Sequence, residues 1–166
     1  MADRPSPPDW PATAAVAGRG QGRPLLLEEP LSFWGGYDAA AGRIVEASHP
    51  QHGQSLIGRV MLMASAKGSS SSSSVLAEAI RNGTGPAAIV MRERDLIVGL
   101  GCIVASELYG IHVPVLVVAC EVWEDMTERS KGASPDWGIT ADGCGECSVR
   151  MIDPMSERST AVAQGE

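Results

Sequence analysis

The chain has 166 residues, of which 44% are hydrophobic and 20% charged, with a formal net charge of −7. This length fits one compact domain with its own core, and the acidic balance argues against binding to nucleic acids or through a basic membrane-binding surface. No run approaches the roughly 18 apolar residues of a spanning helix. The N-terminus lacks the apolar region of a secretory signal, so we expect a cytoplasmic protein.

The two ends of the chain differ from its middle. Residues 1–23 are rich in Pro, Gly and Ala and show little periodicity, which predicts a mobile N-terminal arm. Residues 24–122 carry the regular apolar pattern of a folded domain. Residues 123–166 are polar, and we expect a C-terminal tail that lies on the surface or is partly disordered.

The domain opens with short segments. Leu25–Leu27 is a short apolar run, Leu31–Trp34 is expected to be extended, and Gly35–Gly36 to turn. Tyr37–Pro50 is typical of a loop or a short hairpin.

The middle of the chain alternates buried strands with helices. Continuous apolar runs predict strands buried on both faces, and apolar residues at helical spacing predict helices. The predicted order is strand Val60–Ala64, helix Ser74–Arg81, strand Ala87–Met91, helix Leu96–Leu108 and strand Val113–Ala119. This order predicts an α/β domain with a largely parallel central sheet.

A serine-rich segment, Lys67–Ser74, joins the first of these strands to its helix. Serine runs are commonly flexible linkers, but this one lies inside a folding unit, and its serines are suitable N-caps. A Gly/Ser turn at a helix N-terminus presents backbone N–H groups that favour negative charge. It therefore suits either a bound anion or a serine alkoxide, and the residues alone favour the anion. The patterns of a Walker loop and of a nucleophile elbow are absent.

Other candidate residues have simpler interpretations. His49 and His52 could bind a metal, but a turn or subunit contact fits better, and Trp34 suggests core or interface packing. Charged residues Arg92–Arg94 suggest a solvated face or a subunit interface.

The four cysteines fit a reducing compartment. Cys102 and Cys120 lie in apolar runs and are expected in the core. Cys144 and Cys147 form a single C-x-x-C, a weak metal or redox signal that we interpret as two thiols in the tail.

Several separate motifs resemble, in the same order, the small subunit of the aconitase X family, over about residues 20–120. They are Leu31–Gly36, His49–Pro50, Gly53–Ser55, Gly58–Val60, Gly68–Ser70, Val75–Leu76, Asn82–Gly83 and Pro86–Ile89.

The resemblance implies a swivelling β/β/α domain that works with a large subunit. That partner would carry an iron–sulfur cluster and most of the substrate site, and this chain would bind no metal itself. The implied reactions are dehydration of cis-3-hydroxy-L-proline in bacteria, which the acidic, Ala/Gly-rich chain favours, and of mevalonate 5-phosphate in archaea. An anion- or metabolite-binding module without catalysis is the alternative from another class.

The resemblance also assigns roles within the serine loop. Ser69 would be the proton acceptor, and Lys67, Gly68, Ser70 and Ser71 would contact the substrate. Classical aconitases have an arginine where Ser71 stands, so the cation that polarises Ser69 is either Lys67 or a residue of the partner. Ser71 to Ser74 fit a structural role in the turn better than a substrate contact.

Overall fold

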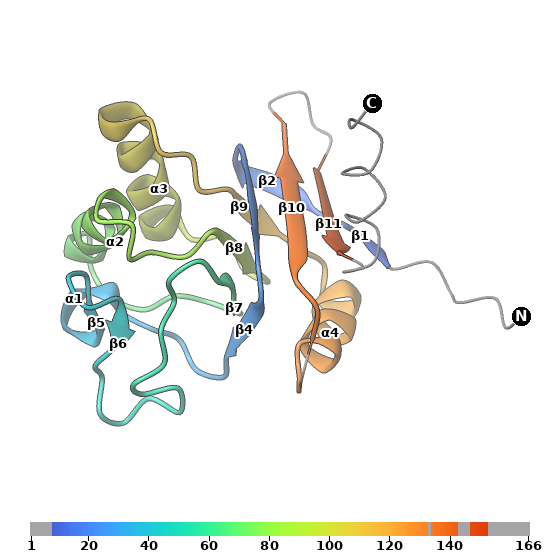
Figure 1. Ribbon diagram of the computed structural model, residues 1–166, viewed down its shortest axis with the longest axis horizontal. Coiled ribbons are helices and arrows are strands. Elements are labelled where there is room, and N and C mark those ends of the chain that lie inside the picture. Colours follow the sequence, from blue (N-terminus) through green and yellow to red (C-terminus); the bar gives the residue numbers. More distant parts are fainter. Residues whose placement is uncertain (1–7, 133, 143–146, 153–166) are drawn as a thin grey trace, which may run out of the picture.

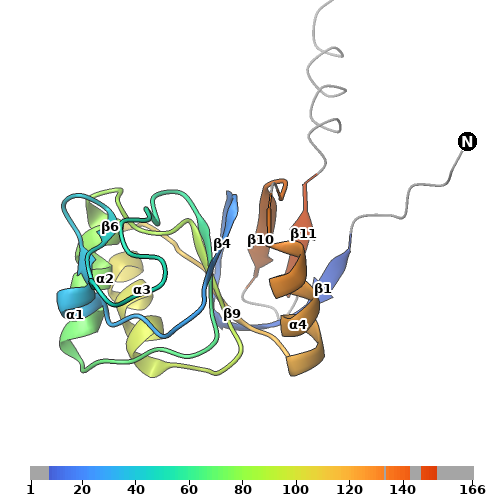
Figure 2. The ribbon, with the colours of Figure 1, turned by 90° about the horizontal axis from the view of Figure 1, so that it is seen from below.

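The computed structural model describes residues 8–132, 134–142 and 147–152. They form three layers: helices α2 (Ser71–Arg81) and α3 (Leu96–Tyr109), a central sheet, and a second sheet (Figures 1 and 2). This β/β/α arrangement confirms the predicted α/β fold. No helix of the described ranges combines the length and apolar character that crossing a membrane requires.

The central sheet is mostly parallel. Strands β4, β7, β8 and β9 run parallel to one another, and β2 joins the edge antiparallel to β9. In spatial order the strands are β2 (Thr13–Val16), β9 (Val115–Val117), β8 (Ala88–Met91), β7 (Val60–Met63) and β4 (Pro24–Leu27).

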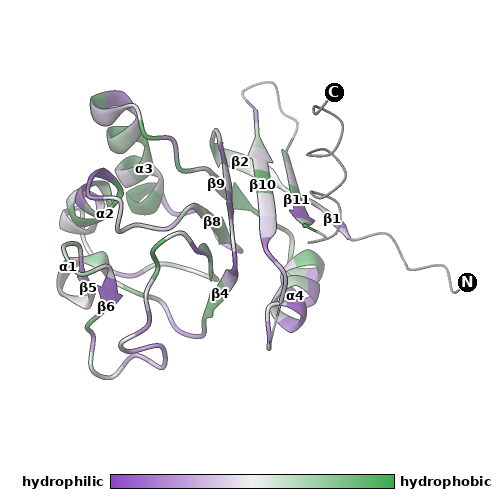
Figure 3. Ribbon diagram, viewed as in Figure 1, coloured by the Kyte–Doolittle hydropathy of each residue, from purple (hydrophilic) through white to green (hydrophobic). Residues whose placement is uncertain are grey.

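Both faces of the central sheet are buried. Met61 and Met63 of β7 pack in the core under the helices, whereas Val60 and Leu62 pack in the core between the two sheets. Successive side chains of a strand point to opposite faces, so a strand covered on both sides needs apolar residues at every position. The hydropathy colouring shows this for β8, which is drawn in the green of hydrophobic residues (Figure 3).

The helices follow the predicted pattern with small shifts. Asp95 caps α3 by accepting a hydrogen bond from the Val98 amide at 2.8 Å, and Gly110 ends it with φ +66. Helix α2 begins at Ser71, three residues before the predicted start at Ser74. A serine, Ser70, occupies the N-cap position as expected, but its side chain makes no capping hydrogen bond.

A short helical turn and a small hairpin lie beside α2. The turn α1 (Phe33–Gly36) replaces part of the predicted extended segment, and Trp34 and Gly35 within it have non-helical dihedral angles. Strands β5 (Tyr37–Asp38) and β6 (Arg43–Ile44) form the hairpin that follows.

The second sheet is antiparallel and joins the two ends of the chain. Its order is β1 (Asp9–Pro11), β11 (Cys147–Met151), β10 (Trp137–Ala141) and β3 (Gly18–Gly22). The rings of Trp10 and Trp137 pack with centroids 4.7 Å apart.

The structure differs here from the predicted N-terminal arm. Residues 9–22 are strands, and the glycines of β3 serve close packing rather than mobility. A Cβ on Gly20 would lie 2.1 Å from the carbonyl oxygen of Ala87, and one on Gly22 would lie 2.0 Å from that of Gly58. Only glycine lets the strand approach the central sheet this closely.

The structure also differs from the predicted C-terminal tail. Helix α4 (Cys120–Arg129) and strands β10 and β11 occupy much of that segment. The Trp10 indole N–H donates to Asp125 of α4 at 2.8 Å. This hydrogen bond and the nearby Arg129 side chain lower the pKa of the Asp125 carboxyl. Residues 1–7, 143–146 and 153–166 lie outside the described part of the chain, so these portions of the predicted arm and tail stay predictions.

Candidate active-site loop

The serine loop lies between β7 and the start of α2, at the carboxyl edge of the parallel strands. Open α/β sheets bind ligands in the crevice outside this edge. The loop therefore has the position expected of a functional site, and it joins two packed elements of one domain rather than linking two domains.

Gly68 fits a position where a side chain has no room. Its φ is +115, and an added Cβ would lie 2.5 Å from Ser32 Oγ and 2.6 Å from Ser72 Oγ. Both the backbone conformation and the space therefore favour glycine. The residue before Ser69 thus sits directly against two serine hydroxyls.

Those two hydroxyls form a closed network with the backbone of Trp34. The Trp34 amide donates to Ser72 Oγ at 3.2 Å, and Ser32 Oγ donates to the Trp34 carbonyl at 3.0 Å. Ser72 Oγ lies 3.1 Å from Ser32 Oγ, so its own proton is free to complete the ring. This network, which we call the serine clamp, fastens α1 to the first turn of α2.

Ser69, Ser70 and Ser71 are exposed. The first hydrogen bonds of the turn are donated by the Ser72 amide to Ser69 O at 2.9 Å and by the Ser73 amide to Ser70 O at 3.1 Å. Within the described residues, the amides of Ser69 to Ser71 and the Ser69 hydroxyl have no protein partner. Unpaired amides at a helix N-terminus favour a nearby anion or alkoxide.

Lys67 makes an ion pair at the base of the loop. Its Nζ lies 2.6 Å from Glu46 Oε1, and its side chain is 45% exposed. The carboxylate offsets much of the lysine charge, which weakens the case for Lys67 as the cation that polarises Ser69.

His49 has a structural role in a turn. It is buried, its Nδ1 accepts from the Gln51 amide at 3.1 Å, and its Nε2 therefore donates to the Glu29 carbonyl at 3.0 Å. His52 is exposed on the same turn. Across the part of the chain that the structure describes, no three His, Cys, Asp or Glu side chains gather as metal ligands would.

The three cysteines that the structure describes lie on three different elements. Cys102 is buried in α3, and burial raises the pKa of its thiol to about 12. Cys120 is exposed at the first residue of α4, so its predicted core position is wrong. Cys147 is half-buried on β11, and Cys144 falls outside the described residues, so the C-x-x-C pair stays untested.

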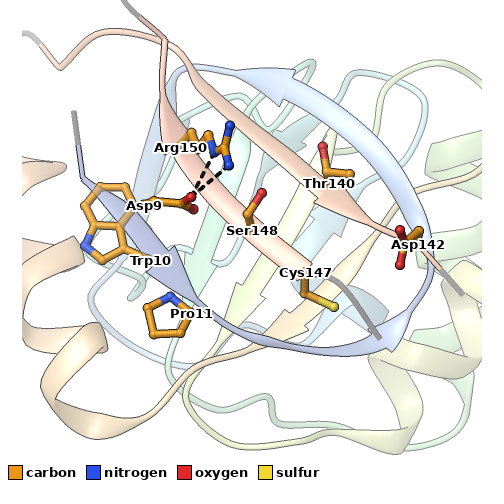
Figure 4. Close-up of a pocket in the computed structure, with 8 residues that line it drawn as sticks. All are labelled: Asp9, Trp10, Pro11, Thr140, Asp142, Cys147, Ser148 and Arg150. Atoms are coloured by element: carbon orange, nitrogen blue, oxygen red, sulfur yellow. Dashed lines mark hydrogen bonds and ion pairs between the residues drawn. The ribbon is translucent and has the colours of Figure 1, made fainter. Parts of the chain in front are cut away.

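A cavity of about 700 Å³ opens on the second sheet (Figure 4). It lies on the far side of the central sheet from the helices and the serine loop. Arg150 and Asp9 form an ion pair across it at 2.8 Å. The other lining residues are Trp10, Pro11, Thr140, Asp142, Cys147 and Ser148. This cavity could not be predicted from the sequence, because the strands that line it lie in the segments predicted to be a mobile arm and a polar tail.

Comparisons with known proteins agree with this arrangement. A family model described as the aconitase X swivel domain matches residues 9–131. The crystal structure of *Thermococcus kodakaraensis* aconitase X in its holo-form aligns with a TM-score of 0.69 and 25% identity, over 88% of this chain and 99% of that chain.

Two curated relatives carry enzyme names. The cis-3-hydroxy-L-proline dehydratase of *Pseudomonas aeruginosa* is 39% identical over 143 residues, which are 86% of this chain and 23% of that protein. The phosphomevalonate dehydratase small subunit of *Methanothermobacter thermautotrophicus* is 42% identical over 89 residues, which are 54% of this chain and 68% of that protein.

The layered fold and the serine turn at a helix N-terminus define a swivelling domain of the aconitase type. The chain belongs to the aconitase X swivel domain family. It matches less than a quarter of the length of two dehydratases, 23% of the *P. aeruginosa* protein and 20% of that from *Hypocrea jecorina*. Most of each of those proteins therefore lies outside the region that this chain matches.

Proposed function

We propose that this chain is the small subunit of an aconitase-X-type hydro-lyase and supplies Ser69 as a general base to an active site shared with a large subunit. The observation that carries the proposal is the exposed Ser69 hydroxyl beside unpaired amides at the first turn of α2. A free serine hydroxyl is a weak base, and those amides would stabilise its alkoxide form.

The favoured substrate is cis-3-hydroxy-L-proline. The Pseudomonas relative named for this activity is 39% identical over 86% of the chain, whereas phosphomevalonate dehydratase small subunits are 42% identical over 54% and, in Pyrococcus furiosus, 34% identical over 77% of it. The Ser69 alkoxide would accept the proton from the α-carbon, the double bond between C2 and C3 would form as the C3–O bond breaks, and the departing hydroxide would take up a proton to become water. The resulting cyclic enamine tautomerises to Δ1-pyrroline-2-carboxylate. Lys67, Gly68, Ser70 and Ser71 would line the substrate side of this loop.

An iron–sulfur cluster does not fit the cysteines of this chain that the structure describes. Cys102, Cys120 and Cys147 lie on α3, α4 and β11 respectively and do not converge. We therefore assign any cluster to the large subunit, and the role of this chain is limited to proton abstraction and substrate contact.

Reconstitution with a purified large aconitase X subunit from the same organism tests the proposal. We expect neither chain to be active alone and the pair to release Δ1-pyrroline-2-carboxylate from cis-3-hydroxy-L-proline, followed by its absorbance or by mass spectrometry. Mevalonate 5-phosphate is the control substrate. Activity of the pair on mevalonate 5-phosphate but not on cis-3-hydroxy-L-proline would make mevalonate 5-phosphate the substrate. A pair without either activity, together with anion binding by this chain alone, would favour the non-catalytic module.

A further inference from the structure

Two arginines lie side by side at the amino edge of the parallel strands, whereas the serine loop follows β7 at the carboxyl edge. Pro24 of β4 pairs with Val60 of β7. Arg23 and Arg59 come directly before these two residues, so they are neighbours across the two strands. Like charges opposite each other on neighbouring strands destabilise a sheet. An anion between them would offset that repulsion.

The Arg59 side chain has a buried donor without a partner. Its Nε is buried and makes no hydrogen bond within the described part of the chain. One terminal nitrogen, Nη2, makes only a long hydrogen bond of 3.4 Å to the Pro24 carbonyl oxygen. Among the described residues, no carboxylate forms an ion pair with Arg59 or Arg23. An arginine stays charged in proteins, and a buried donor of a charged group is costly to leave unpaired.

Both arginines line one cavity of about 270 Å³. The other described residues around it are Pro24, Gly132 and Ser134, none of which is acidic. Ser134 is 8% exposed, and its Oγ accepts the Trp137 indole N–H at 3.2 Å. A hydroxyl that accepts one hydrogen bond still has its own proton to donate. The cavity therefore brings together two guanidinium groups and a buried hydroxyl, which are donors suited to an oxyanion.

A second cavity, of about 520 Å³, adjoins the first at Arg59. The other charged residues that line it are Glu28 and Lys131. The Lys131 Nζ lies 2.6 Å from a carboxylate oxygen of Glu128, which offsets its charge. Glu28 forms no ion pair with Arg59 in the described structure. The smaller cavity is therefore the one in which positive charge is left without a counterpart.

We propose that Arg23, Arg59 and Ser134 form a binding site for a small oxyanion with the geometry of phosphate. The planar guanidinium of Arg59 can direct its Nε–H and an Nη–H at two oxygens of one such anion. The bound anion satisfies the buried Nε and offsets the repulsion between the two arginines. It also connects the loop between α4 and β10, where Ser134 lies, to the amino ends of β4 and β7. This inference is independent of the proposed function.

The test is calorimetric titration of the whole chain with inorganic phosphate, in a buffer that contains no other oxyanion. We expect one phosphate to bind per chain. Arg59→Met and Arg23→Met are each expected to raise Kd about tenfold or more, because each removes charge-assisted hydrogen bonds. The matched control is Arg19→Met, since Arg19 is an exposed residue of β3 that does not line either cavity. It changes the net charge equally and should leave Kd unchanged.

The Nε–H resonance of Arg59 in nitrogen-15 NMR spectra reports directly on the site. It is assigned by its absence in Arg59→Met, and we expect it to shift with phosphate and to saturate at the calorimetric Kd. Phosphate should also raise the unfolding temperature of the wild type but not that of Arg59→Met. Arg23 is exposed, so Arg23→Met tests the site even if Arg59→Met does not fold.

Three outcomes would overturn the oxyanion site. The first is no saturable binding by the wild type at millimolar phosphate. The second is phosphate binding that survives both Arg59→Met and Arg23→Met, which would place the anion at the serine loop. The third is an equal loss of affinity in Arg19→Met, which would show an effect of net charge alone. These measurements need neither turnover nor the large subunit, so an inactive reconstituted pair would contradict the proposed function without affecting this site.

Discussion

The two faces of the central sheet are covered by layers built in different ways. On one face α2 and α3 pack through apolar side chains at helical spacing, and the serine loop lies at the N-terminal end of α2. On the other face β1, β3, β10 and β11 pair residues from the two ends of the chain. The helical layer is assembled from local segments, whereas the second sheet depends on distant pairing.

This difference explains which parts of the fold could be predicted. Each of four elements can be recognised from the apolar pattern of its own residues: β7, β8, α2 and α3. Strand β3 has the sequence Gly-Arg-Gly-Gln-Gly, which resembles a linker until β10 is placed beside it. The glycines matter because of the backbone they contact, and that backbone comes from another part of the chain.

The candidate site divides in the same way. The position of Ser69 on a strand–loop–helix turn followed from the local pattern, and its role as a base came from the family resemblance. The serine clamp could not be predicted, because Ser32 and Ser72 are 40 positions apart and meet only in the folded chain. Their hydroxyls explain why position 68 has no room for a side chain.

The largest effect on stability is expected at the second sheet. Gly22→Ala would place a Cβ 2.0 Å from the carbonyl oxygen of Gly58, so backbone must move. We expect the free energy of unfolding to fall by about 3 kcal/mol, at the upper end of overpacking effects, in urea denaturation. A loss under about 0.5 kcal/mol, the range of ordinary surface substitutions, would show that β3 is as mobile as a linker.

The same substitution in the helical layer is expected to have a smaller effect of opposite sign. Gly99 lies within α3, and the nearest atom to an added Cβ, outside the helix backbone, would be Val16 Cγ2 at 3.9 Å. Gly99→Ala should stabilise the chain by about 1 kcal/mol, because alanine favours the helix. Destabilisation in the same urea titration would contradict the packing described for α3.

Alkylation of the native cysteines tests whether Cys102 of α3 is buried and Cys120 of α4 exposed, without any substitution in the chain. Burial raises the pKa of Cys102 to about 12, and the side chain is inaccessible, whereas Cys120 is exposed on α4. Only the thiolate reacts with iodoacetamide, so in the native chain near pH 8 Cys120 should be alkylated and Cys102 protected. Peptide mass spectrometry would show this, with the urea-unfolded chain as the fully labelled control. Equal labelling of both in the native chain would mean that the helical core opens readily.

The central claim is that Ser69 acts as the base, and the turnover of Ser69→Ala in the reconstituted pair tests it most directly. Ser74→Ala is the matched control, because Ser74 is also exposed but lies within α2. With assembly confirmed by size-exclusion chromatography, we predict that Ser69→Ala lowers kcat by about 10²- to 10⁴-fold while Ser74→Ala retains normal turnover. Near-normal kcat in Ser69→Ala, or an equal loss in both variants, would contradict the account.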